Sequence, residues 1–124
     1  MRDKFKGIYV VNEDGSLSGI NQYPTSIVSG DQINQVRIKN FKNIVQQDVI
    51  GTVQADTLII AYQQLDTDNY AVEGWATIKD NNPLSQHYYQ QAVMNFYYKF
   101  TNLNNNEVDE FGSNGAAPSN WAKD

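Results

Sequence analysis

The chain has 124 residues and a formal net charge of −5, with 40% hydrophobic residues, which is enough for one domain with a sizeable core. It contains no cysteine, and this excludes disulfides and thiolate metal sites. No stretch approaches the roughly 20 apolar residues of a membrane-spanning helix. The first residues lack the apolar run of a secretory signal peptide. We therefore expect a soluble protein that is made in the cytoplasm, that either stays there or is exported by another route, and that does not contact a membrane.

The charges are unevenly distributed along the chain. Residues 1–45 carry six basic and four acidic side chains, whereas residues 46–124 carry three basic and ten acidic ones. An acidic protein is poorly suited to wrap nucleic acid, whose phosphates need Lys and Arg as partners. Fifteen asparagines and eleven glutamines outnumber all charged side chains. Amides hydrogen-bond without titrating, which is typical of a protein–protein contact surface that is insensitive to pH.

Short strand-like runs alternate with turn signals through the first 80 residues. Asp14-Gly15 is a favoured hairpin pair, because both central positions of such a turn tolerate positive φ. Pro24 cannot donate to a strand ladder, so we expect it at the start of a strand or on a sheet edge. The predicted strands are residues 6–11, 17–20, 21–28, 33–41, 47–55, 57–65 and 70–80. Short strands at this spacing predict a single-domain, mainly β fold, either a β-sandwich or a barrel.

The segment that follows fits two secondary structures. Asn82 before Pro83 is a good helix start, because Asn caps unpaired amides and Pro is tolerated at the first helical position. The Phe and Tyr residues further along favour a strand instead. We predict a short helix near residues 83–90 and then a strand over 92–102. The alternative is one helix over 83–103, which changes the class to α+β.

The aromatic stretch NFYYKF, residues 95–100, has two possible roles. As a strand it points one set of residues into the core. The inward residues are Met94, Phe96, Tyr98 and Phe100. The competing hypothesis is a stacking platform or a carbohydrate-binding strip, since Tyr provides a rigid ring with a polar tip. Tyr97 lies on the opposite face, and we expect it to face a partner.

The C-terminal part has the composition of a turn, an edge strand and a tail. Residues 102–111 can reverse the chain and return a short edge strand. Residues 112–124 are rich in Gly, Ala, Pro, Ser and Asn, and only Trp121 is bulky; such segments order themselves poorly alone. We predict a β-domain over residues 1–111 and an extended arm over 112–124 that docks on a neighbouring subunit through Trp121.

Recognisable catalytic motifs are missing. The sequence contains no P-loop, no G-x-G-x-x-G and no H-E-x-x-H, and no Ser or Cys nucleophile is marked beside His87, the single histidine. We therefore expect that the protein is not an enzyme and that it binds neither a cofactor nor a metal. Basic residues cluster in one short stretch, and they join the aromatic candidates for contact with a partner. The candidate interface residues are Tyr97, Trp121, Arg37, Lys39 and Lys42.

Residues 26–41, SIVSGDQINQVRIKNF, carry a resemblance to a known group. An apolar pair precedes Gly30-Asp31, and an alternation follows through Asn34, Val36 and Ile38. This pattern resembles the first strands of small β-domains in baseplate and adaptor proteins of phages that infect Gram-positive bacteria. The strand–turn–strand rhythm further along is compatible with it. The resemblance implies a virion part that is not an enzyme and that packs its β-domain into symmetric assemblies.

Two functional hypotheses follow. The first is a structural component of a bacteriophage virion, in the tail, the baseplate or the capsid surface, which is located in the virion and acts by symmetric homo-oligomeric assembly. Its partners are then itself and other virion proteins, with no small-molecule substrate. The alternative is a small phage- or plasmid-encoded binding module or inhibitor that binds a host protein or nucleic acid.

Overall fold

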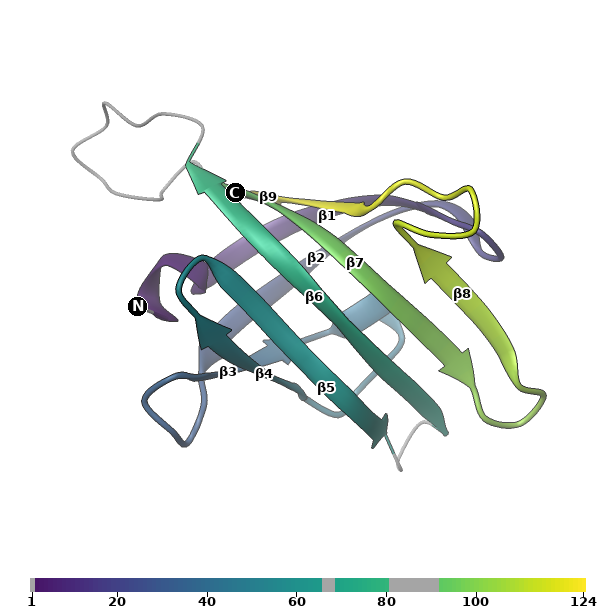
Figure 1. Ribbon diagram of the computed structural model, residues 1–124, viewed down its shortest axis with the longest axis horizontal. Helices are drawn as coiled ribbons and strands as arrows, with labels where there is room; N and C mark the ends of the chain where they lie inside the picture. The colour runs from purple at the N-terminus through teal and green to yellow at the C-terminus, as the bar shows by residue number, and fades with distance from the viewer. Residues whose placement is uncertain (1, 66–68, 81–91) are drawn as a thin grey trace.

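Antiparallel strands make up most of the protein, and eight of them close into a barrel (Figure 1). The computed structural model describes residues 2–65, 69–80 and 92–124. The strands are β1 (Gly7–Gly15), β2 (Gly19–Ser29), β3 (Gln35–Lys39), β4 (Val49–Gln54), β5 (Thr57–Leu65), β6 (Tyr70–Asp80), β7 (Ala92–Asn102), β8 (Glu107–Phe111) and β9 (Ser119–Lys123). The 3-10 helices are η1 (Arg2–Phe5) and η2 (Phe41–Asn43). No helix in these ranges is long and apolar enough to cross a lipid bilayer. The predicted mainly β class, with a barrel as one of its two forms, is confirmed.

The barrel closes through the C-terminal strand. Strands β1 to β6 each pair with the next in sequence, and β6 pairs with β7 along its whole length. The other edge of β7 is divided, because β9 pairs with residues 93–96 and β8 with residues 98–102. β9 also pairs with β1, which completes the eight-stranded ring. β8 is therefore an additional strand beside the second half of β7.

The secondary structure of residues 92–102 is the strand β7, so the alternative of one continuous helix over 83–103 is wrong. The run of Phe and Tyr residues prefers an extended backbone, on which alternate side chains reach the core. Phe96 is fully buried and Tyr98 nearly so, as are the other two residues predicted to point inward. The predicted short helix near residues 83–90 lies outside the described residues.

The first hairpin turns later than its sequence predicts. β1 continues through Gly15, and the turn lies at residues 16–18. The predicted strands 17–20 and 21–28 are a single strand, β2. Pro24 lies within β2, but β3 pairs only with residues 26–29 of this strand. No residue of β3 is paired with Pro24, so Pro24 occupies a local sheet edge. At such an edge the missing N–H of proline leaves no ladder hydrogen bond unmade.

Helix η2 places an aromatic ring at the centre of the barrel. The ring of Phe41 lies 5.1 Å from that of Tyr98 and 6.0 Å from that of Trp121. The chain makes this inward step through residues in the left-handed region, with φ of 61° at both Lys42 and Asn43. The interior is thus a packed aromatic core.

The C-terminal segment is part of this core and not an arm. Residues 119–123 form β9, which hydrogen-bonds to β1 and β7 of the same chain. Trp121 is 0% exposed, and its ring lies 5.0 Å from Phe96 and 6.0 Å from Tyr9. The predicted boundary at residue 111 and the role of Trp121 as an anchor on a neighbouring subunit are therefore wrong. Burying this large ring and closing two strand edges outweigh the polar composition around it.

Candidate functional site

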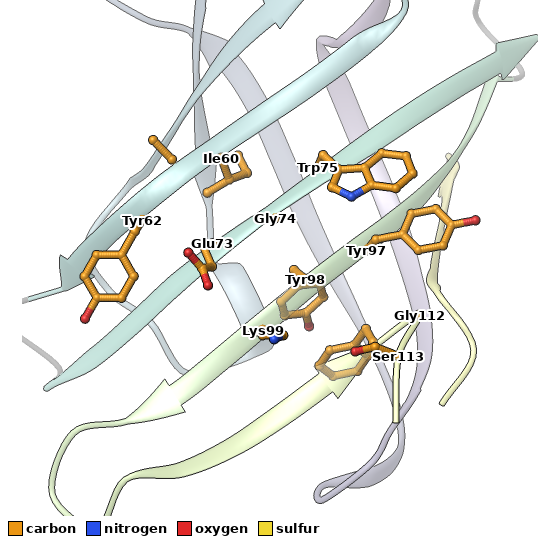
Figure 2. Close-up of a pocket in the computed structure, with 12 residues that line it drawn as sticks. Ile60, Tyr62, Glu73, Gly74, Trp75, Tyr97, Tyr98, Lys99, Gly112 and Ser113 are labelled. Atoms are coloured by element: carbon orange, nitrogen blue, oxygen red, sulfur yellow. The ribbon is translucent and has the colours of Figure 1, made fainter. Parts of the chain in front are cut away.

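A groove with a volume of about 500 Å³ opens on the barrel wall formed by β5, β6, β7 and the end of β8 (Figure 2). It is lined by aromatic rings, two glycines and a few polar side chains. The lining residues are Ile60, Ala61, Tyr62, Glu73, Gly74, Trp75, Tyr97, Tyr98, Lys99, Phe111, Gly112 and Ser113. This mixture of apolar surface with a small number of polar groups is typical of ligand sites.

Trp75 and Tyr97 form an aromatic platform at one end of the groove. They are directly opposite each other on β6 and β7, and their rings stack at 4.3 Å with an interplanar angle of 13°. Trp75 is 45% exposed. The backbone at Gly112, with φ of +82°, runs so close to the Tyr97 ring that a side chain there would collide with it. The platform is therefore rigid and open to solvent on the tryptophan side.

Tyr62 extends from β5 at the other end of the groove (Figure 2). The pairing of β5 with β6 shifts register between Ile60 and Gln63, which is a β-bulge. The side-chain oxygen of Gln63 accepts a hydrogen bond from the Ile50 N–H at 3.0 Å. Its side-chain nitrogen donates to the Ile50 carbonyl at 2.9 Å. It thereby replaces a missing part of the ladder to β4. Bulges commonly re-aim a side chain, and here Tyr62 is exposed beside the groove.

Polar groups lie between the aromatic ends. Glu73 and Lys99 are cross-strand partners, and both are exposed. The Lys99 Nζ is 3.9 Å from Glu110 Oε1, so the ammonium stays available to other acceptors. Gly74 allows β6 and β7 to approach closely here, because an added Cβ would lie 2.5 Å from the Cβ of Tyr98. The centre of the groove offers both donors and acceptors.

Behind the groove, inside the barrel, lies a buried carboxylate. Oε1 of Glu13 accepts hydrogen bonds from Ser119 Oγ at 2.6 Å, Tyr98 Oη at 2.9 Å and Tyr23 Oη at 3.4 Å. Burial, together with the Glu13 charge, raises the pKa of Tyr23. Burial, Tyr23 and Glu13 likewise raise the pKa of Tyr98 far above its ordinary value. These phenols stay protonated and act as hydrogen-bond donors.

Lys42 lies in this interior, and its predicted place in a basic interface patch is wrong. Its Nζ is 2.7 Å from Asp109 Oδ2 and 3.4 Å from Glu13 Oε2. Oδ1 of Asp109 accepts from the backbone amides of Leu17 and Ser18 at 3.0 and 3.3 Å. Burial alone raises the pKa of Asp109, but the hydrogen bonds from Lys42, Ser18 and Leu17 outweigh it and lower the pKa. The left-handed turn at η2 directs this lysine inward.

Arg37 and Lys39 are two positions apart on β3 and therefore lie on the same face of the strand, at the surface. Each is matched by acidic groups: Lys39 Nζ is 2.7 Å from Asp48 Oδ2, and the Arg37 guanidinium is 2.9 Å from Asp31 Oδ2. Arg37 also lies 3.7 Å from the Asp48 carboxylate. The local charge is therefore close to neutral, and this pair makes no strong basic patch.

Of the five candidate interface residues, Tyr97 is the one placed in the groove. The sequence patterns do not single out the two other exposed aromatic residues of the groove, Trp75 and Tyr62. Trp75 can be recognised from the period of two in a strand. The apolar residues Val72 and Ala76 occupy the inward positions of β6, so Trp75 falls on the outer face. No group of three or more His, Asp or Glu side chains that could hold a metal occurs in the described part of the chain; His87 lies outside it.

The geometry defines the protein as an antiparallel β-barrel with one additional strand and a surface groove. No protein-family model and no curated protein matches the chain. A crystal structure of a protein of unknown function from Bacteroides ovatus is similar in fold, with a TM-score of 0.53 and 10% sequence identity. The similarity covers 96% of this chain but 41% of the other. This likeness establishes the fold alone.

Proposed function

We propose that the protein is a binding module that holds a carbohydrate chain in the groove on β5–β8. The observation that carries the proposal is the solvent-open Trp75–Tyr97 platform beside the exposed pair Glu73 and Lys99. Sugar rings have apolar C–H faces that stack on aromatic rings, and hydroxyl edges that need both donors and acceptors. Tyr62 supplies a third ring at the far end of the groove.

The backbone pairing around the groove disfavours an extended peptide as ligand. Recognition of a peptide by strand addition needs an unpaired strand edge. β6 is paired with both β5 and β7, and β7 is paired with β6 on one edge and with β8 and β9 on the other. Over β6 and β7 the groove therefore recognises its ligand through side chains, which suits a ligand with its own rigid apolar faces.

Charge disfavours nucleic acid as the ligand. The groove contains Glu73, Glu110 lies close to Lys99, and the whole chain has a formal net charge of −5. Among the described residues that line the groove, Lys99 alone provides a cation, whereas a nucleic-acid strand requires neutralisation of several phosphates. Neutral hydroxyl groups carry no such requirement.

Screening of the purified protein on a glycan array, followed by calorimetric titration with the best oligosaccharide, tests the proposal. Trp75→Ala and Tyr97→Ala should each weaken binding by about tenfold or more, because they remove the stacking surface. Ile20→Ala, an exposed apolar residue on β2, is the matched control and should bind normally. An array without any bound glycan, or equal affinity of Trp75→Ala and the parent protein, would refute the carbohydrate proposal.

A structural role in a phage virion is the second candidate, and exposed apolar side chains favour it. Ile20 is 88% exposed, and Leu17 in the preceding turn and Ile33 in the loop before β3 are also exposed. Apolar side chains at loop tips are suited to contacts between subunits. Mass measurement in solution tests this role: an oligomer that Leu17→Asp with Ile20→Asp dissociates would support it. A stable monomer at micromolar concentration would count against it.

A further inference from the structure

Three ionisable side chains meet inside the barrel beside the groove and have no part in the proposed function. The side chains of Lys42 and Asp109 are each 6% exposed, and that of Glu13 is 0% exposed. Lys42 Nζ contacts Asp109 Oδ2 at 2.7 Å and Glu13 Oε2 at 3.4 Å. One ammonium thus lies between two carboxylates. Among the described residues, Glu13 Oε2 is the buried side-chain oxygen or nitrogen that lacks a hydrogen-bond partner.

The surroundings of this triad are apolar. The Lys42 Nζ lies 4.6 Å from the centre of the Phe111 ring and 5.7 Å from that of Phe100. Loss of one proton from the Lys42 ammonium gives the neutral amine, which is the nucleophilic form of lysine. The Glu13 Oε2 atom, with its free lone pairs, is placed to accept a proton from the ammonium.

We propose that Lys42 and Asp109 react with each other to form an intramolecular amide bond, with Glu13 carrying the protons. Glu13 takes a proton from the Lys42 ammonium and passes it to Oδ2 of Asp109. The neutral Nζ then attacks Cγ of Asp109, which forms the N–C bond and moves the carbonyl electron pair onto Oδ1. A proton leaves Nζ through Glu13 to Oδ2, the Cγ–Oδ2 bond breaks, and water departs. Glu13 returns to its starting state, and no oxidant or activated co-reactant is consumed.

The backbone supplies the stabilisation that this attack requires. The amides of Leu17 and Ser18 donate to Asp109 Oδ1 at 3.0 and 3.3 Å, and Oδ1 is the oxygen on which negative charge develops. This arrangement resembles an oxyanion hole. Oδ2, the oxygen that leaves, is the one that faces Lys42. Strand β8 holds Asp109 and the left-handed turn of η2 holds Lys42, so the reacting groups are kept in contact.

The amide would join η2, which carries the central Phe41, to β8. This strand pairs with β7 but is not one of the eight strands of the closed ring. These residues are 67 positions apart in the sequence. A bond between them closes a long covalent loop without cysteine, and it replaces a buried ion pair with a neutral group. The chain would thereby gain the kind of constraint that a disulfide provides in other small β-proteins.

Intact mass spectrometry of the full-length parent protein tests the proposal directly. The expected mass is the sequence mass minus one water molecule, and a digest should yield a branched peptide that contains both Lys42 and Asp109. Lys42→Met and Asp109→Ala should restore the full sequence mass, and Glu13→Gln should slow or abolish the loss of water. Because the mass of the parent protein decides the question, poor folding of a variant does not obscure it.

The control concerns Asp14-Gly15, a sequence that can lose water by forming a cyclic imide. Peptide mapping separates the two products, since the imide leaves Lys42 and Asp109 in unlinked peptides. The full sequence mass in the parent protein, or a loss of water located at Asp14, would overturn the proposal. Complete amide formation in the Glu13→Gln variant would show that Glu13 does not transfer the protons.

Discussion

Ser119 donates a hydrogen bond of 2.6 Å to Oε1 of Glu13, across 106 residues of sequence. The same hydroxyl accepts a hydrogen bond of 2.8 Å from Nε1 of Trp121. One small side chain at the start of β9 therefore donates to Oε1 of a buried carboxylate on β1 and accepts from the polar atom of a buried indole. The closure of the barrel depends on this contact as well as on the backbone ladder.

Ser119→Ala should destabilise the protein by about 1–3 kcal/mol, because it leaves Trp121 Nε1 without an acceptor and removes a donor from Glu13. The urea midpoint should fall while the slope of the transition stays unchanged. Ser113→Ala is the matched control, since Ser113 bonds Glu110 at 3.0 Å on the exposed surface and should change stability by less than about 0.5 kcal/mol. Equal effects of the two changes would contradict this role of Ser119.

The two tryptophans provide a matched pair for the closure of the barrel. Trp121→Ala should cost about 3–5 kcal/mol or prevent folding, because it empties a fully buried site. Trp75→Ala should cost much less, since Trp75 is 45% exposed. Each variant retains one tryptophan, so fluorescence reports the environment of the other: blue-shifted for Trp121 and red-shifted for Trp75. Similar unfolding midpoints for both variants would contradict the placement of β9 in the core.

Gly74→Ala should destabilise the protein by about 1–3 kcal/mol through overpacking. An added Cβ would meet the Tyr97 carbonyl as well as the Cα and Cβ of Tyr98, where β6 and β7 approach each other. Backbone atoms of a paired strand cannot move away as a flexible side chain can. Thermal and urea unfolding measure the effect, with Thr77→Ala on the exposed face of the same strand as the control. An unchanged Tm for Gly74→Ala would show that the strands are further apart.

Stability should fall at alkaline pH because of buried tyrosines. Burial raises the pKa values of Tyr9, Tyr23 and Tyr98 above the ordinary value near 10. Above that value the unfolded chain loses phenolic protons that the folded protein retains, so each tyrosine lowers stability by up to about 1.4 kcal/mol per pH unit. Tyr23→Phe should make the fall of unfolding free energy with pH less steep by the contribution of one tyrosine. Urea titrations between neutral and strongly alkaline pH measure this dependence. A slope equal to that of the parent protein would show that Tyr23 ionises in the folded state.

Much of the local structure follows from the order of residue types. The strands over 57–65, 70–80 and 92–102 coincide with their predicted bounds, because apolar alternation and turn residues act within short windows. The inward face of β7 follows from the same period of two. The same period also places Tyr97 on the outward face of β7. Tyr97 is one of the two rings of the aromatic platform.

Local residue patterns establish the strands over 57–65, 70–80 and 92–102 and the apolar face of each, since these depend on neighbours a few positions away. The long-range packing establishes that residues 119–123 form a strand between β1 and β7, that Lys42 turns inward to Asp109, and that Trp75 stacks on Tyr97. These contacts join residues far apart in the chain, and they depend on register and ring closure. Closing the barrel buries Trp121 and pairs two exposed strand edges at once. This stabilisation depends on residues far apart in the chain, so a short window of sequence does not reveal it.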